Sequence, residues 1–179
     1  MEFVLLGWPP DGPTLELDYR TFSYAGKFVM SATGKAVARE DGEIVAAVAF
    51  NEDRTDETTL WLRYVTVCED RRGEGIGPRL LSFTRARAAD RGYASLRIAV
   101  NNPFAYEAGY RAGFAYTGET TGIAELVLAW PGDRSPARYR AGLERYRERD
   151  LSPEEVAFLD DRRGADPPAT VAVPASGGS

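Results

Sequence analysis

The stretch Leu60–Gly77, LWLRYVTVCEDRRGEGIG, decides the fold of this chain. It opens with a mostly apolar run, rich in β-branched and aromatic residues, that is typical of a buried strand. A short charged connection follows, then three glycines spaced by two and an amphipathic segment. A strand, a glycine-rich loop and a helix in this order point free backbone N–H groups at one place, where they bind anions such as phosphate. Taken alone, the three glycines are equally compatible with a turn that binds nothing.

Residues in and beyond this loop resemble one known family. The segment from Val67 to Gly77 resembles the acetyl-CoA signature of the GNAT acyltransferases, in which a strand ends in valine and Arg-x-x-Gly-x-Gly opens a helix. Asn102-Pro103-Phe104-Ala105 and Gly113-Phe114 resemble the second CoA motif of that family. The resemblance covers roughly residues 44–128. The glycine spacing does not fit a dinucleotide-binding fingerprint, and no Lys-Ser/Thr pair follows as in a P-loop.

The resemblance implies a fold of the α/β (α+β) class, with a mixed, mostly antiparallel twisted sheet flanked by helices. Hydrophobic periodicity and turn residues predict a compatible order of elements. We expect strands over 3–6, 28–39, 44–50, 60–67, 96–100, 114–118 and 123–130, and helices over 78–91 and 103–112.

The resemblance also implies how acetyl-CoA is held as a co-substrate. Backbone groups of the strand before the loop bond the pantetheine arm, and loop amides take the pyrophosphate. Asn102 contacts pantetheine, although a helix-capping role explains this residue equally well. The cofactor-binding residues implied in this way are Val65, Thr66, Val67, Arg72, Gly73, Glu74, Gly75, Ile76, Gly77, Asn102 and Ala105.

From the resemblance we expect the acid that protonates the departing thiolate to be displaced from its usual place or absent. The family pattern puts a tyrosine seven residues after the capping Asn and four before the Gly-Phe pair, and both counts lead to Gly109. Tyr106 and Tyr110, on the same expected helix, are therefore the catalytic candidates. Each is equally compatible with an aromatic residue of the core or of the rim of the site.

The sequence does not identify a general base. Such families often carry a carboxylate on the strand before the loop, but residues 60–67 contain no Asp or Glu. Glu52, Asp53 and Glu125 lie on or near neighbouring strands, and each is explained as well by an ordinary surface carboxylate. Deprotonation of the amine by solvent is the alternative.

Composition excludes several classes of function. The 179 residues carry a formal charge of −5, which disfavours binding to nucleic acid. No apolar run approaches the eighteen or so residues of a membrane span, and residues 1–13 have no basic leader segment, so we expect a cytoplasmic protein. Cys68 is the only cysteine and there is no histidine, so neither a zinc site nor a His-activated nucleophile is expected.

The chain divides into three parts by composition. We expect a GNAT acyl-CoA-binding domain over 1–131, a short C-terminal helical extension over 132–163 and a disordered tail over 164–179, where Pro, Ala, Gly and Ser dominate. Ser135 and Ser152 are helix starts, the second with capping-box spacing. The Arg- and Glu-rich helix between them is either a solvated helix packed by one edge or a helix that binds a partner.

The sequence thus predicts transfer of an acetyl or other acyl group from acetyl-CoA to a primary amine, by direct attack in a ternary complex. The acceptor is a small molecule or a peptide or protein amine, no metal takes part, and a homodimer is an open alternative. Two rival hypotheses are a catalytically weak CoA-binding or protein-interaction module and a structural domain with an empty loop.

Overall fold

The computed structural model describes residues 1–122 and 125–177. The chain forms two compact units, which are described separately. Unit one comprises Met1–Leu96 together with the chain from Ala172 onward, and unit two comprises Arg97–Val171. None of the helices in the described residues is long and apolar enough to span a membrane.

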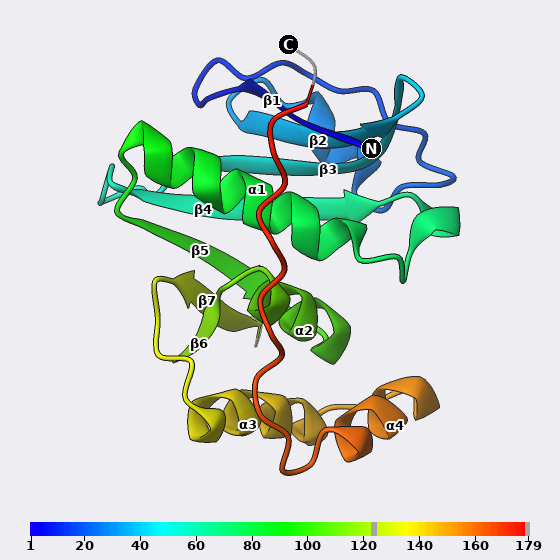
Figure 1. Ribbon diagram of the computed structural model, residues 1–179, viewed down its shortest axis with the longest axis vertical. Helices are drawn as coiled ribbons and strands as arrows, with labels where there is room; N and C mark the ends of the chain where they lie inside the picture. The colour runs from blue at the N-terminus through cyan, green and yellow to red at the C-terminus, as the bar shows by residue number, and fades with distance from the viewer. Residues whose placement is uncertain (123–124, 178–179) are drawn as a thin grey trace. The chain divides into compact units, whose positions relative to one another are not determined.

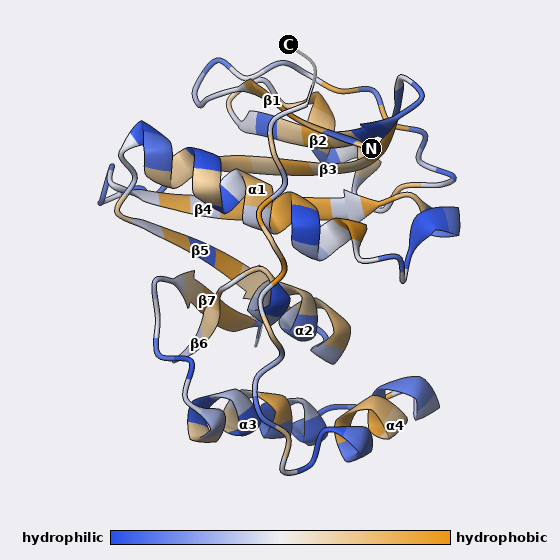
Figure 2. Ribbon diagram, in the orientation of Figure 1, coloured by the Kyte–Doolittle hydropathy of each residue, from blue (hydrophilic) through white to orange (hydrophobic). Residues whose placement is uncertain are grey.

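Unit one is an antiparallel sheet with a long helix across one face (Figure 1). The strands β1 (Glu2–Gly7), β2 (Gly34–Glu40), β3 (Glu43–Glu52) and β4 (Thr59–Val67) lie in sequence order. The helix α1 (Ile76–Arg91) buries Leu80, Leu81 and Phe83. Figure 2 shows the strands coloured largely as hydrophobic, while α1 carries hydrophilic turns as well. The inner face that the amphipathic pattern after Gly77 predicts is buried, and the burial extends around the helix to Leu81 and Ser82.

A different kind of element covers the other face of this sheet. The short 3₁₀ helix η1 (Ala25–Val29) places Phe28, which is fully buried, against Val37, Ala47 and Ala49. The expectation of one strand over 28–39 is therefore wrong at its start, because Phe28 belongs to η1 and β2 begins at Gly34. Burial of Phe28 outweighs the strand pattern of the residues that follow it.

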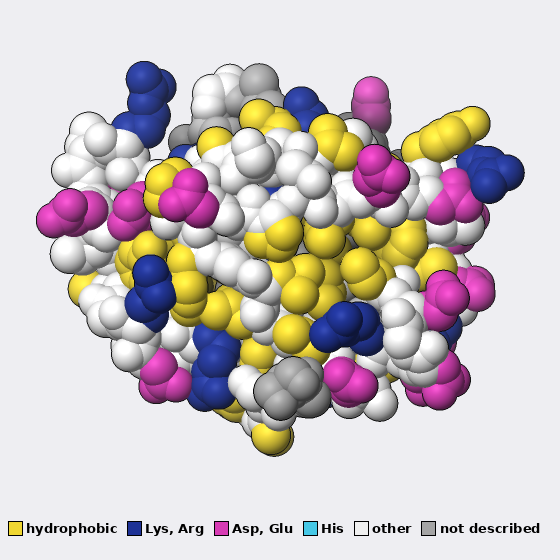
Figure 3. All heavy atoms as spheres, turned by 90° about the horizontal axis from the view of Figure 1, so that it is seen from above, with side chains coloured by type: hydrophobic (Ala, Val, Ile, Leu, Met, Phe, Trp, Pro, Cys, Tyr) yellow, Lys and Arg dark blue, Asp and Glu magenta, His cyan; other side chains and the backbone are white. Residues whose placement is uncertain are grey.

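Hydrophobic side chains also remain at the surface. Figure 3 shows them gathered on one face of the molecule, among charged ones. In unit one the large side chains that are exposed include Tyr19, Tyr24, Val29 and Met30.

Unit two contains three strand segments in the order β5, β7, β6. The strand β5 (Ser95–Val100) enters from unit one, and β6 (Ala115–Thr120) pairs with β7 (Leu126–Trp130) as an antiparallel hairpin. The strand expected over 123–130 is observed from Leu126, and residues 123–124 lie outside the described part of the chain. The helices are α2 (Pro103–Arg111), α3 (Pro136–Arg145) and α4 (Pro153–Asp161), and the 3₁₀ turn η3 (Tyr146–Glu148) follows α3.

The two serines predicted to start helices do so. The Ser135 side chain accepts a hydrogen bond from Arg138 N–H, and Ser152 and Glu155 form a reciprocal capping box. Four tyrosines, each at most 1% exposed, form the core beneath these helices: Tyr106, Tyr110, Tyr139 and Tyr146. The Arg- and Glu-rich helix α3 is thus packed against the rest of unit two by one edge, which is one of the two interpretations that its composition allows.

The last part of the chain makes defined contacts, whereas its composition led us to expect disorder. In unit two, Val171 N–H donates to Arg111 C=O, and Arg140 donates to Gly164 and Ala165 C=O. In unit one, Gly177 N–H donates to Phe3 C=O. In each of these contacts the last part of the chain takes part through a backbone N–H or C=O group, and such groups leave no signature in composition. The division of the chain at 131 and 163 stays a prediction.

We expect Gly142→Ala to destabilise the protein, although alanine normally favours a helix. A Cβ at this position of α3 would overlap the hydroxyl and ring of Tyr106. Overpacking of this kind costs about 1–3 kcal/mol, which outweighs the ~1 kcal/mol gain in helix propensity. The measurement is the free energy of unfolding in urea. Gly26→Ala is the control, because nothing lies within 4 Å of the Cβ added there. Equal stabilities of the two variants would contradict the packing described here.

Candidate functional site

The site begins with an extra residue in β4. Phe50 pairs with Leu62 and the next residue back, Ala49, pairs with Tyr64, so Arg63 is a bulge in β4. A bulge shifts the alternation of side chains by one residue. Tyr64 therefore packs on the Phe28 side of the sheet, and Val67 lies on the α1 side, 3.6 Å from the Cβ position of Gly77.

The same register fixes the direction of the backbone groups after the bulge. Cys68 N–H donates to Val45 C=O at 2.8 Å, which extends the pairing of β3 with β4 by one residue. Backbone groups of alternate residues point to opposite edges of a strand. Thr66 therefore faces β3, while Val65 and Val67 present their N–H and C=O groups to the other edge. In agreement, Val67 C=O accepts a hydrogen bond from Arg72 Nε at 3.3 Å.

The loop after β4 leads into α1 through two glycines in the left-handed region. Gly73 has φ 84° and Gly75, the residue that caps α1, has φ 79°. No side chain caps this helix. Among the described residues, no acceptor bonds the N–H groups of Gly73, Glu74, Gly75, Ile76 and Gly77. A row of free N–H groups at a helix N-terminus is a binding site for an anion.

Two arginines hold this loop in place. Arg71 forms ion pairs with Glu40, at the end of β2, and with Glu74 inside the loop. Arg72 donates to Val67 C=O and, through Nη2, to Ser23 Oγ at 3.2 Å. Arg72 therefore supports the loop, and its contact with a ligand stays a prediction. Arg71 was not identified from the sequence, because its partner Glu40 lies 31 residues away and no local pattern links the two.

The second group of expected site residues lies in unit two. Asn102 caps α2, with Oδ1 accepting from Ala105 N–H at 2.8 Å. Its Nδ2 donates to Asn101 Oδ1 at 3.0 Å. Ala105 takes part through its backbone alone. The capping role of Asn102 is thus confirmed, and a contact of Asn102 with a ligand stays a prediction.

The two candidate tyrosines are fully buried in unit two. Tyr106 Oη donates to Tyr139 C=O at 2.8 Å, and Tyr110 Oη accepts from Tyr116 N–H at 2.9 Å. Burial raises the pKa of both phenols above the ordinary value. Both therefore stay protonated at neutral pH, and release of the proton is harder than from an exposed tyrosine.

Gly109 has no room for the tyrosine that the family pattern puts there. The residue is buried on α2, and a Cβ added to it would lie 2.5 Å from Leu128 Cδ1 on β7. The space beside Gly109 is thus filled by Leu128, so a larger residue at 109 would require this leucine to move.

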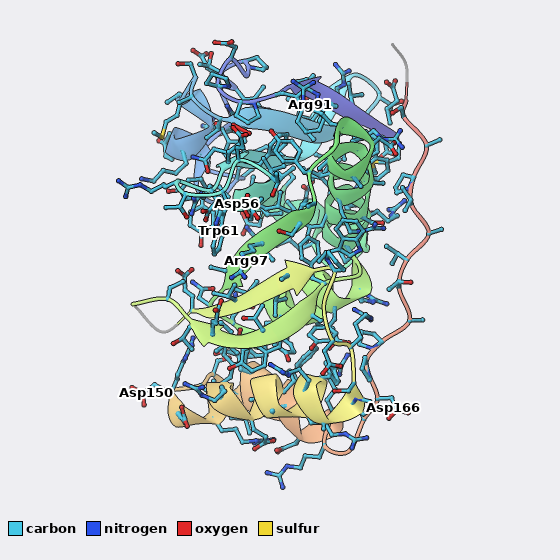
Figure 4. All side chains as sticks on the ribbon, turned by 90° about the vertical axis from the view of Figure 1, so that its left-hand side faces the viewer. Asp56, Trp61, Arg91, Arg97, Asp150 and Asp166 are labelled. Carbon is cyan, nitrogen blue, oxygen red and sulfur yellow. The ribbon has the colours of Figure 1, made fainter. Side chains whose placement is uncertain are left out.

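The three carboxylates considered as bases are engaged by neighbours. Asp53 accepts from Trp61 Nε1 at 2.7 Å and from Thr55, and these hydrogen bonds lower its pKa to about 2. Figure 4 labels Trp61 in this region of unit one. Glu52 accepts from the hydroxyl of Tyr93, and Glu125 from that of Thr121. A carboxyl group with so low a pKa has a weakly basic carboxylate, so Asp53 is a poor general base. The structure therefore does not single out a general base among these three residues.

The one nucleophilic thiol is not activated. Cys68 Sγ donates to Asp70 Oδ1 at 2.9 Å, and this hydrogen bond raises the pKa of the thiol. The described residues contain no group of three or more His, Cys, Asp or Glu side chains that could hold a metal ion.

A cavity in unit one lies away from the loop. It has a volume of about 420 Å³, and the C-terminal end of α1 forms part of its wall. Because α1 has 16 residues, this end is about 24 Å from the helix start at the loop. The cavity is lined by Pro9, Glu52, Glu57, Thr58, Arg91, Gly92 and Tyr93.

Comparison with protein families gives one match. Residues 4–114 match the model of the family described as the acetyltransferase (GNAT) family. No curated protein matches the chain.

Several solved structures are similar in part. A nourseothricin acetyltransferase is 24% identical with a TM-score of 0.48, over 54% of this chain and 64% of that one. The PaiA N-acetyltransferase from Thermoplasma acidophilum, in complex with coenzyme A, is 16% identical with a TM-score of 0.46, over 53% and 58%. The ribosomal-protein-alanine N-acetyltransferase from Brucella melitensis is 23% identical with a TM-score of 0.43, over 54% and 66%. The chain thus spans less than two thirds of the length of each of these proteins.

We expect Cys68 to react slowly with a thiol reagent at pH 8, because the Asp70 carboxylate stabilises the protonated thiol. Asp70→Asn removes this carboxylate and lowers the thiol pKa, so the thiolate fraction and the rate should rise about threefold or more. The release of the chromophore of an aromatic disulfide reagent measures the rate. Glu69→Gln is the control, since it neutralises the adjacent carboxylate without changing the hydrogen bond of Cys68. An equal rise in both variants would show that general charge controls the rate.

Proposed function

Because the chain belongs to the GNAT family of acetyltransferases, we propose that it transfers an acetyl group from acetyl-CoA to a primary amine. The observation that carries this proposal is the row of N–H groups from Gly73 to Gly77 that no acceptor bonds in the described residues. These groups follow β4 directly and stand at the positive end of the α1 dipole. The residues thus fit the pyrophosphate of CoA in chemistry and in place.

In unit one, the loop and β4 serve different parts of the co-substrate. The N–H groups of residues 73–77 take phosphate oxygens, and the bonds of Arg71 and Arg72 keep the loop in position. Val65 and Val67 offer backbone groups at the edge away from β3, so the pantetheine amides can pair with them as an added strand does. Thr66 contributes by holding β4 to β3 through the register described above.

In unit two, we assign Asn102 and Ala105 to the pantetheine contact, as the family motif implies. The extended backbone of Asn102 (φ −149°, ψ 158°) and its cap on α2 fix the direction of the first turn of this helix. Backbone groups at the start of α2 then have a defined position for a polar ligand.

The chemistry proposed is direct attack. The nitrogen of a neutral amine forms a bond to the thioester carbon, the C–S bond breaks, and the amine loses one proton while the thiolate gains one. A covalent enzyme intermediate is disfavoured, because the pKa of Cys68 is raised rather than lowered. Asp53 is unsuited to take the amine proton for the reason given above, and Glu52 and Glu125 are each engaged by a neighbouring hydroxyl, so we propose solvent as the acceptor of that proton.

For the acid that protonates the thiolate we propose Tyr110 before Tyr106. Both phenols are protonated at neutral pH, as an acid must be. The proton of Tyr106 is already donated to Tyr139 C=O, whereas Tyr110 Oη accepts a hydrogen bond from Tyr116 N–H. Tyr110 thus has a proton to donate without first breaking a hydrogen bond to a carbonyl.

One observation favours a second function, a CoA-binding module with little or no catalysis. Gly109 stands where the family has its tyrosine, and Leu128 fills the space beside it. This alternative predicts CoA binding without release of free thiol from acetyl-CoA, whatever amine is supplied. A panel of small amines, peptide N-termini and lysine peptides, tested for thiol release, separates the two functions and identifies the acceptor class.

We further propose that the protein acts in the cytoplasm, without nucleic acid or a membrane as partner; homodimer formation stays a prediction.

We expect Gly75→Ala to weaken CoA binding about tenfold or more. Alanine at φ 79° is strained by about 1–2 kcal/mol, and the helix start must distort to relieve this strain. Distortion moves the N–H groups that we assign to the pyrophosphate. Calorimetric titration with CoA measures the dissociation constant.

Gly92→Ala is the matched control for this experiment. Gly92 caps the other end of α1, also has positive φ, and also has nothing within 4 Å of an added Cβ. Its substitution should lower the stability by a similar amount and leave CoA affinity unchanged. Equal CoA affinities in the two folded variants would contradict the assignment of this loop to the CoA-binding site.

We expect Tyr110→Phe to lower kcat about tenfold or more at saturating acetyl-CoA, with CoA affinity intact, because general acid catalysis contributes at least this much. Tyr106→Phe should change kcat by less than about threefold. The comparison is made with an acceptor found in the amine panel. Unchanged kcat in both variants would exclude tyrosine acid catalysis, and thiolate would then leave unaided or through water.

A further inference from the structure

The turn between β5 and α2 is bonded by residues of the C-terminal extension. Tyr146, at the start of η3, is fully buried and donates its hydroxyl to Val100 C=O at 3.0 Å. Arg149, just after η3, donates Nη1 to Asn101 C=O at 3.0 Å. The guanidinium of Arg149 also lies over the ring of Tyr146, 4.8 Å from its centroid. All of these contacts lie within unit two.

These bonds fix the two carbonyls that directly precede Asn102. A carbonyl belongs to the same rigid peptide plane as the following N–H, so holding it limits rotation about the next residue. Val100 is the last residue of β5 and Asn102 is the cap of α2. The two bonded carbonyls therefore lie in the short connection between this strand and this helix. In the described part of the chain, other restraints on this turn are the cap itself, the Asn101–Asn102 side-chain bond, the bond from Tyr106 N–H to Asn102 C=O, and the place of Val100 in β5.

The extension that supplies these donors is itself firmly attached to α2. Tyr106 Oη donates to Tyr139 C=O, and Tyr139 Oη donates to Glu107 Oε2 at 2.6 Å. Gly142 lets α3 approach the ring of Tyr106 more closely than any other residue would. The position of η3 therefore follows from the packing of α3 on α2, and Tyr146 reaches Val100 from a rigid base.

We infer that Tyr146 and Arg149 are positioning residues for CoA binding, acting through Asn102. This inference rests on the proposed function, and it gives the C-terminal extension a role in the same site. The charged face of α3 then needs no binding partner to explain why the helix is present. The extension shapes the part of the site that meets pantetheine, and it has no part in holding the pyrophosphate.

The test compares three single variants of the full chain. Tyr146→Phe removes the bond to Val100, Arg149→Gln removes the charged donor to Asn101, and Tyr139→Phe is the control. Tyr139 is a buried phenol of the same extension, but its hydroxyl bonds Glu107 and not the turn. Thermal unfolding confirms that each variant is folded. We expect the dissociation constant for CoA to rise about three- to tenfold in the first two variants and less than twofold in the control.

Two further measurements separate positioning from a general loss of stability. Adenosine 3′-phosphate 5′-diphosphate carries the pyrophosphate but no pantetheine, so its affinity should be the same in Tyr146→Phe and in the unchanged protein. In an Asn102→Ser background, which keeps a helix cap, Tyr146→Phe should weaken CoA binding no further.

The possible outcomes distinguish a failure of this inference from a failure of the proposed function. Equal CoA affinity in Tyr146→Phe and the unchanged protein overturns this inference alone. The same holds for an equal loss in Tyr139→Phe, for full additivity with Asn102→Ser, or for a loss of affinity toward the nucleotide without pantetheine. Failure of the unchanged protein to bind CoA overturns the proposed function, and the inference that rests on it falls too.

Discussion

The extra residue in β4 is the constraint on which the arrangement in unit one depends. Because Arg63 has no register partner in β3, the strand after it is shifted by one position. The side chain of Tyr64 then lies on the face that Phe28 covers, and the backbone groups of Thr66 face β3. Val65 and Val67 are left with backbone groups at the opposite edge. The bulge thus decides which backbone groups of β4 face β3 and which face the opposite edge, where we propose that the pantetheine arm pairs.

The loop after β4 depends on this register in turn. Val67 C=O faces away from β3, so Arg72 can bond it, and Arg71 ties the loop to the end of β2. Exposed ion pairs contribute little to stability on their own. Here their effect is geometric, since Arg71 links the loop residue Glu74 to Glu40 at the end of β2, while the N–H groups of residues 73–77 bond no acceptor in the described structure.

The parts of the fold and site that the sequence predicted correctly are encoded by neighbouring residues. Strand, glycine loop and helix follow one another from Leu60 to Arg91, and Asn102, Ser135 and Ser152 start helices as their spacing indicates. The parts that were missed depend on distant residues. Phe28 is helical because its burial site is formed by β2 and β3, and the ion pair of Arg71 with Glu40 requires the sheet to exist first. The hydrogen bonds of residues 171 and 177 likewise involve backbone groups far away in the chain.

The buried tyrosines show why the site in unit two differs from the family pattern. Leu128 fills the space beside Gly109, and the hydroxyl of Tyr106 donates a hydrogen bond to Tyr139 C=O in the extension. Tyr146 and Arg149 use the same extension to hold the start of α2. One packing arrangement therefore removes a phenol from α2 as a free proton donor and stabilises the turn that carries Asn102. Tyr110 is packed into the same cluster, with its ring 4.8 Å from that of Tyr139, but its hydroxyl accepts a hydrogen bond from Tyr116 N–H and this difference is the reason that we propose it as the acid.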